Sequence, residues 1–303
     1  MSVKEIATGL RFPEGPIAMD DGSVVLVQIE RGTLSRVQPD GAVEVIAELG
    51  GGPNGAAVGP DGWIYVCNNG GFEWTESDGR LYPGHQAADY KTGRIEKVNP
   101  ATGEFQVLYT QCGDVPLKGP NDIVFDREGG FYFTDLGKTR DREMDRGAMF
   151  YARPDGSYIT QIASGLITPN GCALSPDEKT LYFAETIPSR LWALDILEPG
   201  EVMRPKGMPA RLICNPGGYQ FFDSMAVDAE GWISVATIHN GGITSASPDG
   251  KQVEHFATDD FLTTNICFGG EGLRTAFITL SSTGKLIAVD WPRPGLPLNY
   301  LNK

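Results

Sequence analysis

Histidine is scarce in this chain, and the cysteines lack the spacing of a metal-binding or redox motif. The 303 residues include only three histidines, no two of them closely spaced, and the five cysteines contain no CxxC pair. Because structural and catalytic zinc sites are usually built from closely spaced His and Cys ligands, the sequence gives little support to a His-based zinc site. We expect the cysteines to be buried thiols: Cys67, Cys112, Cys172, Cys214 and Cys267.

Positive charge and long apolar runs are also missing. The chain carries 25 Lys and Arg against 39 Asp and Glu, a formal net charge of −14, and it has no basic run, so it would repel a nucleic acid. No apolar run approaches the roughly 18 residues of a membrane helix, and the first residues, MSVKEIATGLRF, lack the apolar core of a secretory signal. We therefore expect a soluble, cytoplasmic protein without nucleic-acid or membrane partners, and the sequence leaves its oligomeric state open.

What the chain has in abundance is a repeated pattern. Six copies of an acidic or amide residue, an apolar run, a turn and a second β-rich run begin 40 to 67 residues apart, and only the second interval contains a large insertion. Such spacing is typical of a radial or linear array of supersecondary units. The copies are PEGPIAMDDGSVVLV, PNGAAVGPDGWIYVC, PNDIVFDREGGFYFT, PNGCALSPDEKTLYF, FDSMAVDAEGWISVA and TNICFGGEGLRTAFI.

Each copy continues with further β-type runs, as in GRIEKVN (93–99) followed by FQVLYT (105–110), so one repeat holds about four strands. Six such repeats predict an all-β protein: a six-bladed β-propeller with four-stranded antiparallel blades, forming a single domain over residues 1–303. The last repeat lacks its own outer strand. We expect VKEIATG (3–9) to complete that blade and so close the ring without free edges.

The residue that opens each copy would lie at one mouth of the central channel, because the first strand of each blade lines that channel. A single Asn before a strand is usually a turn residue, but six at equivalent positions converge in space. The opening residues are Glu14, Asn54, Asn121, Asn170, Asp223 and Asn265.

Four of these residues form the predicted metal site. Glu14, Asn121, Asn170 and Asp223 offer only oxygen ligands, and two of them are charged, which suits one hard divalent ion such as Ca²⁺, Mg²⁺ or Mn²⁺. Positions left open on the ion would allow Lewis-acid catalysis; the alternative is an ion that only holds the blades together.

Four other polar residues lie near the predicted strand ends. For Asn54 and Asn265, substrate contact and turn structure are equally compatible with the sequence. Asp135 and Glu185 end second strands. There, hydrogen bonding between blades is a better interpretation than catalysis.

Across nearly its whole length, the chain resembles the family of six-bladed propellers that includes gluconolactonase, regucalcin (senescence marker protein) and diisopropyl fluorophosphatase. In that family, the metal-binding Glu, Asn and Asp match Glu14, Asn170 and Asp223, and a further Asn that meets metal and substrate matches Asn121. The resemblance implies metal-dependent hydrolysis of a sugar lactone or related cyclic ester. The stretches that carry it are FPEGPIAM (12–19), GPNDIVFDREGGFYFTD (119–135), TPNGCALSPDEKTLYFAET (168–186), FFDSMAVDAEGWISVA (221–236), HNGGITSASPDGK (239–251) and TNICFGGEGLRTAFIT (264–279).

Two positions depart from the family pattern. Ser224 follows Asp223 where the family usually has Gly. Gly119 stands where regucalcin-type members carry an Arg that binds sugar hydroxyls, so that mode of recognition is not available. Either another group recognises the substrate or the substrate carries fewer hydroxyls. The aromatic-rich insertion 70–93 could form a lid over the mouth or a mobile surface loop.

The hypothesis from sequence is a lactonase with one divalent ion, Ca²⁺ before Mg²⁺, Mn²⁺, Zn²⁺ or Fe²⁺, that acts on a small-molecule lactone. Asp223 is the candidate general base, with direct nucleophilic attack by its carboxylate as the rival role. The alternatives are hydrolysis of organophosphates or fluorophosphates at the same site, and a calcium-binding scaffold without catalysis.

Overall fold

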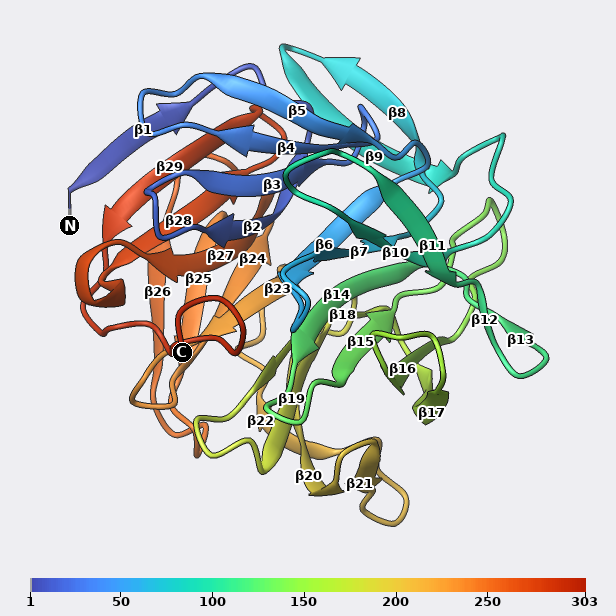
Figure 1. The fold of residues 1–303 in the computed structure, drawn as a ribbon. Coiled ribbons are helices and arrows are strands. Elements are labelled where there is room, and N and C mark those ends of the chain that lie inside the picture. Colours follow the sequence, from blue (N-terminus) through green and yellow to red (C-terminus); the bar gives the residue numbers. More distant parts are fainter. Residues whose placement is uncertain (1) are drawn as a thin grey trace.

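The computed structural model describes residues 2–303 and contains six antiparallel sheets arranged around a centre (Figure 1). The predicted six-bladed propeller is therefore confirmed. Blade 1 consists of β2 (Pro13–Ala18), β3 (Val24–Gln28), β4 (Thr33–Val37) and β5 (Val43–Glu48); blade 2 of β6 (Pro53–Val58), β7 (Ile64–Asn68), β10 (Arg94–Val98) and β11 (Phe105–Tyr109); and blade 3 of β14 (Pro120–Phe125), β15 (Phe131–Asp135), β16 (Gly147–Ala152) and β17 (Ile159–Leu166).

The second half of the chain forms the other three blades. In blade 4 two short strands share the outer position, since both pair with the third strand. Blade 4 consists of β18 (Pro169–Leu174), β19 (Thr180–Glu185), β20 (Arg190–Glu198), β21 (Glu201–Met203) and β22 (Arg211–Cys214); blade 5 of β23 (Phe221–Val227), β24 (Ile233–Ile238), β25 (Gly242–Ala246) and β26 (Val253–Ala257); and blade 6 of β27 (Thr263–Gly269), β28 (Thr275–Leu280), β29 (Lys285–Asp290) and β1 (Val3–Ala7).

The ring closes as the sequence predicts. Strand β1 pairs antiparallel with β29, with Val3 opposite Val289 and Ala7 opposite Leu286. The first strand of the chain is thus the outer strand of the last blade, and β29 is hydrogen-bonded on both sides. Such closure removes the unpaired edge that an open sheet would present to other chains.

Within residues 2–303, few elements lie outside the blades. Two hairpins lie in the connections around blade 2, β8 (Phe72–Ser77) with β9 (Arg80–Gln86) and β12 (Gln111–Cys112) with β13 (Val115–Pro116), and one short 3₁₀ helix, η1 (Glu271–Leu273), precedes β28. No helix within residues 2–303 has the length and apolar character needed to cross a membrane.

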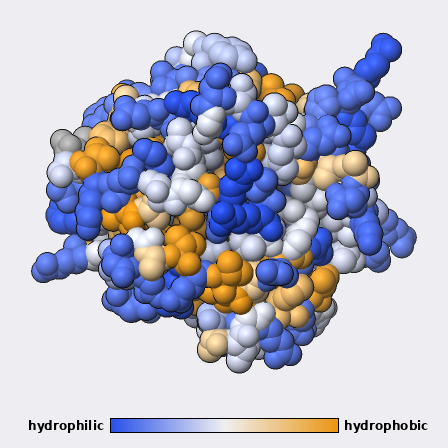
Figure 2. All heavy atoms as spheres, turned by 90° about the horizontal axis from the view of Figure 1, so that it is seen from above, coloured by the Kyte–Doolittle hydropathy of each residue, from blue (hydrophilic) through white to orange (hydrophobic). Residues whose placement is uncertain are grey.

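The hydrophobic core lies between neighbouring blades, because each sheet buries both faces against the next. Between blades 2 and 3, for example, Tyr65 packs against Phe125 and Phe131, with ring centroids 5.0 and 5.7 Å apart. Four of the five cysteines are buried free thiols, whereas Cys112 is only half-buried because it lies in the short β12–β13 hairpin. The outer surface is more polar: the face shown in Figure 2 is largely hydrophilic, with separate hydrophobic patches.

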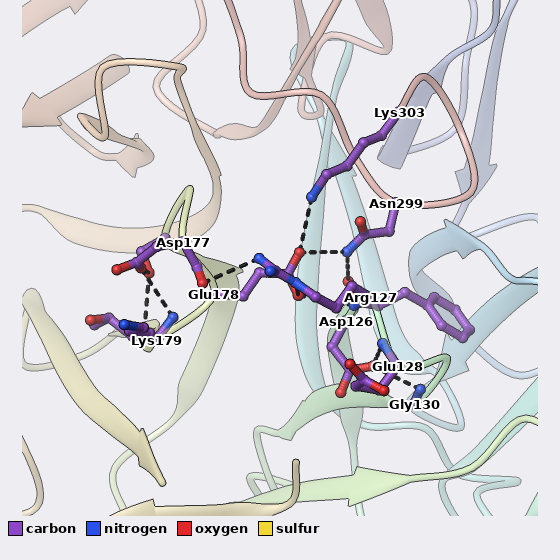
Figure 3. A network of polar contacts seen from close by, with 12 residues as sticks. Asp126, Arg127, Glu128, Gly130, Asp177, Glu178, Lys179, Asn299 and Lys303 are labelled. Atoms are coloured by element: carbon purple, nitrogen blue, oxygen red, sulfur yellow. Dashed lines mark hydrogen bonds and ion pairs between the residues drawn. The ribbon is translucent and has the colours of Figure 1, made fainter. Parts of the chain in front are cut away.

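The C-terminal segment, residues 292–303, crosses the end of the channel where the inner strands finish. The backbone N–H of Leu296 donates to Val227 O, and the side chain of Asn299 donates to Phe125 O. Glu178 then binds the segment through Asn299 and through Lys303, whose Nζ lies 3.1 Å from Glu178 Oε1 (Figure 3). The segment therefore connects the far ends of blades 3, 4 and 5.

Candidate metal centre and channel mouth

The six opening residues lie where the inner strands break register. In each blade the pairing between the first and second strands is interrupted at or beside this residue, as between Glu14 and Ile17 in blade 1. An irregularity of this kind changes the direction of a side chain. Glycines then let neighbouring inner strands approach: a Cβ on Gly171 would lie 2.7 Å from the carbonyl oxygen of Asp223.

A polar residue at the end of the second strand positions the incoming segment in four blades. Asp135 accepts the backbone N–H groups of Lys118 and Gly119, both at 2.7 Å, and Glu185 accepts that of Ile167 at 2.6 Å. Both carboxylates thus hold the chain as it enters from the preceding blade, which agrees with a structural role between blades. Gln28 and Asn68 do the same in blades 1 and 2.

Glu14 and Asp223 are buried carboxylates that act on each other electrostatically. Glu14 Oε2 accepts hydrogen bonds from Asn265 Nδ2 at 2.6 Å and from the N–H of Gly15 at 2.8 Å. Burial raises the pKa of Glu14, and burial together with the nearby Glu14 charge raises the pKa of Asp223 well above its usual range. Within residues 2–303 the partners of both carboxylates are neutral, and neither forms an ion pair. Two such groups favour a bound cation.

The predicted amide ligands are also buried, and one has an unused oxygen. Within the described chain Asn121 Oδ1 has no hydrogen-bond partner, although it is shielded from solvent. Asn170 lies close enough to Asp223 to oppose the rise in the pKa of that carboxyl. Its Nδ2 donates to Thr186 Oγ1 at 3.1 Å, and its Oδ1 accepts a hydrogen bond from Ser224 Oγ at 3.4 Å. A buried carbonyl oxygen without a donor is costly unless an ion or water satisfies it.

These residues fit a hard divalent cation. Two carboxylates would balance its charge, and the free oxygen of Asn121 would add a neutral ligand. Residues 2–303 hold no group of three or more His, Cys, Asp and Glu side chains placed to bind a metal. The fit therefore depends on amide oxygens as much as on carboxylates.

The other two opening residues differ in their surroundings. Asn265 donates to Glu14 and its Oδ1 accepts the N–H of Ile266, so it supports a predicted ligand. Asn54 Oδ1 accepts from Asn69 Nδ2 at 3.1 Å, and Asn69 in turn contacts the segment that leads to the β8–β9 hairpin. Substrate contact by either residue stays a prediction.

The sequence analysis did not identify Asp122, a third carboxylate close to the ring formed by the six opening residues. Its oxygens accept the N–H groups of Ile123 and Cys172, and burial, with a smaller effect of Glu14, raises its pKa to about 7. One sequence difference could have indicated this residue: the position after the opening residue is Gly in blades 1, 2 and 4 but Asp in blade 3. Asp122 lines a cavity of about 100 Å³ below the ring, which the C-terminal residues 296–299 and Lys303 bound at its other end.

The insertion 70–93 forms an ordered hairpin on the mouth side. Strands β8 and β9 rise from blade 2; Trp74 packs on Phe12 beside blade 1, and the N–H of Leu81 donates to Ser282 O in blade 6. The hairpin thus extends along the mouth over three blades, which agrees better with a lid than with a free loop. At Gly119, a Cβ would lie 2.5 Å from Gly137 O, so the backbone packing leaves no space for a side chain there.

Lys138 is a buried lysine without a carboxylate partner in the described chain, and sequence reasoning did not identify it. Its Nζ donates to the carbonyl oxygens of Asn69 at 2.9 Å and Gly71 at 2.7 Å and lies 4.3 Å from the ring centre of Phe72. It therefore binds the base of the hairpin. Burial lowers its pKa to about 7.

The lowered pKa of Lys138 predicts a specific dependence of stability on pH. Between pH 7 and about 10.5 the unfolded state holds more protons on this lysine than the folded state, so its contribution to stability rises with pH, by up to about 1.4 kcal/mol per pH unit. The Lys138→Met variant lacks this pH-dependent contribution to stability. We expect denaturant unfolding at pH 7, 8 and 9 to show that the unfolding free energy of wild type, minus that of the variant, increases with pH. Lys251→Met, at an exposed lysine, serves as the control, and parallel profiles for wild type and Lys138→Met would refute the assignment.

The fold and the site together define a six-bladed propeller whose inner strands direct acidic and amide side chains to one channel mouth. The family model described as "SMP-30/Gluconolactonase/LRE-like region" matches residues 12–282, and the chain belongs to this family. The resemblance seen in the sequence is thereby confirmed.

Individual relatives agree with this assignment. A gluconolactonase of Zymomonas mobilis is 27% identical over 92% of this chain and 79% of its own length. Lactonase drp35 of Staphylococcus saprophyticus is 30% identical over 77% of this chain, and the match spans 65% of that protein. Among solved structures, a gluconolactonase of Xanthomonas campestris has a TM-score of 0.74 at 23% identity, covering 97% of this chain and 89% of the other. A calcium-binding regucalcin of Agrobacterium tumefaciens has a TM-score of 0.73 at 20% identity, covering 94% and 92%. At these identities the structures support the fold.

Proposed function

We propose that this protein is a lactonase that depends on one divalent metal ion, with Ca²⁺ as the first candidate. The observation that carries the proposal is the pair of buried carboxylates, Glu14 and Asp223, together with the buried, unpaired oxygen of Asn121 at the equivalent position of blade 3. Lactone hydrolysis is the activity in the names of the gluconolactonase and drp35 relatives. The oxygen-only ligand set favours Ca²⁺ or Mg²⁺ over softer metals.

In this proposal Glu14, Asn121, Asn170 and Asp223 would hold the ion. A bound divalent ion supplies Lewis acidity, which polarises a carbonyl oxygen and lowers the pKa of water. The remaining hydrogen bonds keep the ligands in place: Asn265 fixes Glu14, and Thr186 orients the amide of Asn170.

Asp223 is the proposed general base. Its carboxylate would accept a proton from the water that attacks the lactone carbonyl carbon. The ring C–O bond then breaks, and the leaving alkoxide takes up a proton to give a hydroxy acid. Direct attack by Asp223 on the carbonyl carbon is the rival step. That attack would break the ring C–O bond and give a mixed anhydride, which water would then hydrolyse at the carboxyl carbon of Asp223. One oxygen of the Asp223 carboxylate would be in the product, so single-turnover hydrolysis in ¹⁸O water distinguishes the two.

The test is metal-dependent turnover. We expect protein treated with a chelator to lose lactone hydrolysis, and added Ca²⁺, Mg²⁺ or Mn²⁺ to restore it, in an assay that follows acid release with a panel of γ-, δ- and aldonolactones. The same additions should raise the melting temperature, because an ion that binds only the folded state stabilises it.

Two outcomes would count against the proposal. Full activity after chelation would exclude a required ion, and metal binding without turnover of any lactone would favour the calcium-binding scaffold. A parallel panel of organophosphates tests the alternative that the same site hydrolyses organophosphates or fluorophosphates.

A further inference from the structure

Five aromatic side chains form a continuous band at the mouth, which we call the aromatic band: Tyr219, Phe221, His239, Phe261 and Tyr82. Their ring centroids follow one another at short distances. Tyr219 lies 4.8 Å from His239, Phe221 lies 4.9 Å from His239, His239 lies 6.1 Å from Phe261, and Phe261 lies 5.9 Å from Tyr82.

The band lies on the same side of the propeller as the candidate metal centre. Inner strands begin at the mouth and second strands end there, so Phe221 at the start of β23 and His239 just after β24 both lie on this side. Phe261 precedes the inner strand β27, and Tyr82 comes from the β8–β9 hairpin. Phe221 also precedes Asp223 by only two residues on β23. A molecule whose reacting group meets Asp223 would therefore place its remaining atoms beside the band.

Much of the band is open to solvent. Tyr219 is 75% exposed, and His239 is also exposed. The part of the His239 ring that is packed against its neighbours is shielded from water, and this partial desolvation lowers its pKa. Tyr82, Phe221 and Phe261 are partly buried. Single exposed aromatic residues are common, but a continuous, partly exposed group beside a channel mouth is typical of a binding surface.

The polar groups next to the band already have partners. Arg80, which lies over the ring of Phe261, donates to Ser282 Oγ at 2.9 Å and to Asp260 at 3.4 Å. Asp260 also accepts from the N–H groups of Leu262 and Thr283, and the amide of Gln220 bonds Gly217 and Asn240. The hydroxyls of Tyr82 and Tyr219 and the ring nitrogens of His239 could pair with a few substrate hydroxyls. Hydroxyls placed against the rings of Phe221 and Phe261 would be buried without partners, which is costly.

We propose that the aromatic band binds an apolar substituent on the lactone, so that the substrate class is an alkyl- or aryl-substituted lactone rather than a polyhydroxylated sugar lactone. This inference rests on the proposed lactonase function and adds the substrate class. The band supplies rigid apolar area, which stabilises a substituent by burial, while the metal centre acts on the ester group whatever the substituent is.

The test compares three lactones that share a six-membered ring, using metal-loaded full-length protein. δ-Valerolactone has no substituent, δ-decalactone carries a pentyl chain, and glucono-δ-lactone carries hydroxyls. We expect kcat/KM, after subtraction of spontaneous hydrolysis, to be about 10- to 100-fold higher for δ-decalactone than for δ-valerolactone, and glucono-δ-lactone to be the poorest of the three.

Two variants locate the effect. Tyr219→Ala and Phe261→Ala should each lower kcat/KM for δ-decalactone about 10-fold and change that for δ-valerolactone less than threefold. Tyr158→Ala, at a half-exposed tyrosine on the opposite side of blade 3, should change neither. The unchanged turnover of δ-valerolactone also shows that each variant is folded.

The outcomes are distinct. Preference for glucono-δ-lactone, or equal losses on all three substrates in the band variants, would overturn the substrate class while leaving the lactonase intact. Absence of turnover with every lactone and metal would overturn the lactonase proposal and this inference together.

Discussion

Asp223→Asn is expected to lower kcat/KM for lactone hydrolysis by about 100- to 10,000-fold, the usual contribution of a general base. It removes the proposed base and one of the two charges available to the ion. Glu14→Gln should cause a loss of at least about 100-fold, because it removes the other charge while keeping the acceptor of the Asn265 hydrogen bond. Both variants are nearly isosteric, so the fold should persist.

Asp223→Asn should change the melting temperature, relative to wild type, in opposite directions without and with metal. In the metal-free protein, Asp223→Asn relieves repulsion between two buried carboxylates, so the melting temperature should equal or exceed that of wild type. With metal, wild type should gain stability and the variant should gain little. Differential scanning calorimetry with and without Ca²⁺ measures both effects.

Asp20→Asn provides the charge-matched control, since Asp20 is exposed in the β2–β3 turn on the opposite side. It should leave turnover and the metal-induced shift unchanged. Normal hydrolysis by both Asp223→Asn and Glu14→Gln would remove the proposed site.

Deletion of residues 2–7 is expected to cost roughly 3 to 5 kcal/mol of unfolding free energy, at about 1 kcal/mol per backbone hydrogen bond between β1 and β29. For a protein of this size, that is a fall in melting temperature of about 10 °C. The deletion also leaves the edge of β29 unpaired, so we expect concentration-dependent aggregation, measurable by light scattering.

A control separates the backbone pairing from the side chains. Val3→Ala changes a side chain that is 56% exposed and leaves the pairing with Val289 intact, so it should lower the melting temperature by no more than about 2 °C. An unchanged melting temperature in the deletion variant would show that ring closure contributes nothing to stability.

The blades and their closure could be predicted because they depend on a pattern that repeats. Each copy specifies its own strands and turns, and the missing outer strand of the last copy indicates that VKEIATG must supply it. Burial of the six opening residues follows from their shared position, since equivalent positions of a closed array meet at its centre. The structure places Glu14 and Asp223 close enough to affect each other's charge.

The remaining features depend on segments that do not repeat. The aromatic band combines a hairpin from blade 2 with residues of blade 5 and of the segment before blade 6, and no local pattern pairs Tyr82 with Phe261. No sequence pattern singles out Lys138, and only the packing of Asn69 and Gly71 around it reveals its burial. Asp122 was not singled out because Asn121, the residue before it, matches the repeated pattern, and an Asp in a turn-like context has many ordinary roles.

The C-terminal segment lies across the far end of the channel, so the mouth is the expected route for a substrate. Residues 296–299 and Lys303 line the cavity there, and the product is expected to leave by the mouth as well. Opening a lactone turns a neutral guest into a carboxylate anion, and the surrounding protein bears 14 excess negative charges. The net negative charge of the protein would thus repel the anionic product, and this repulsion would favour product release after each turnover.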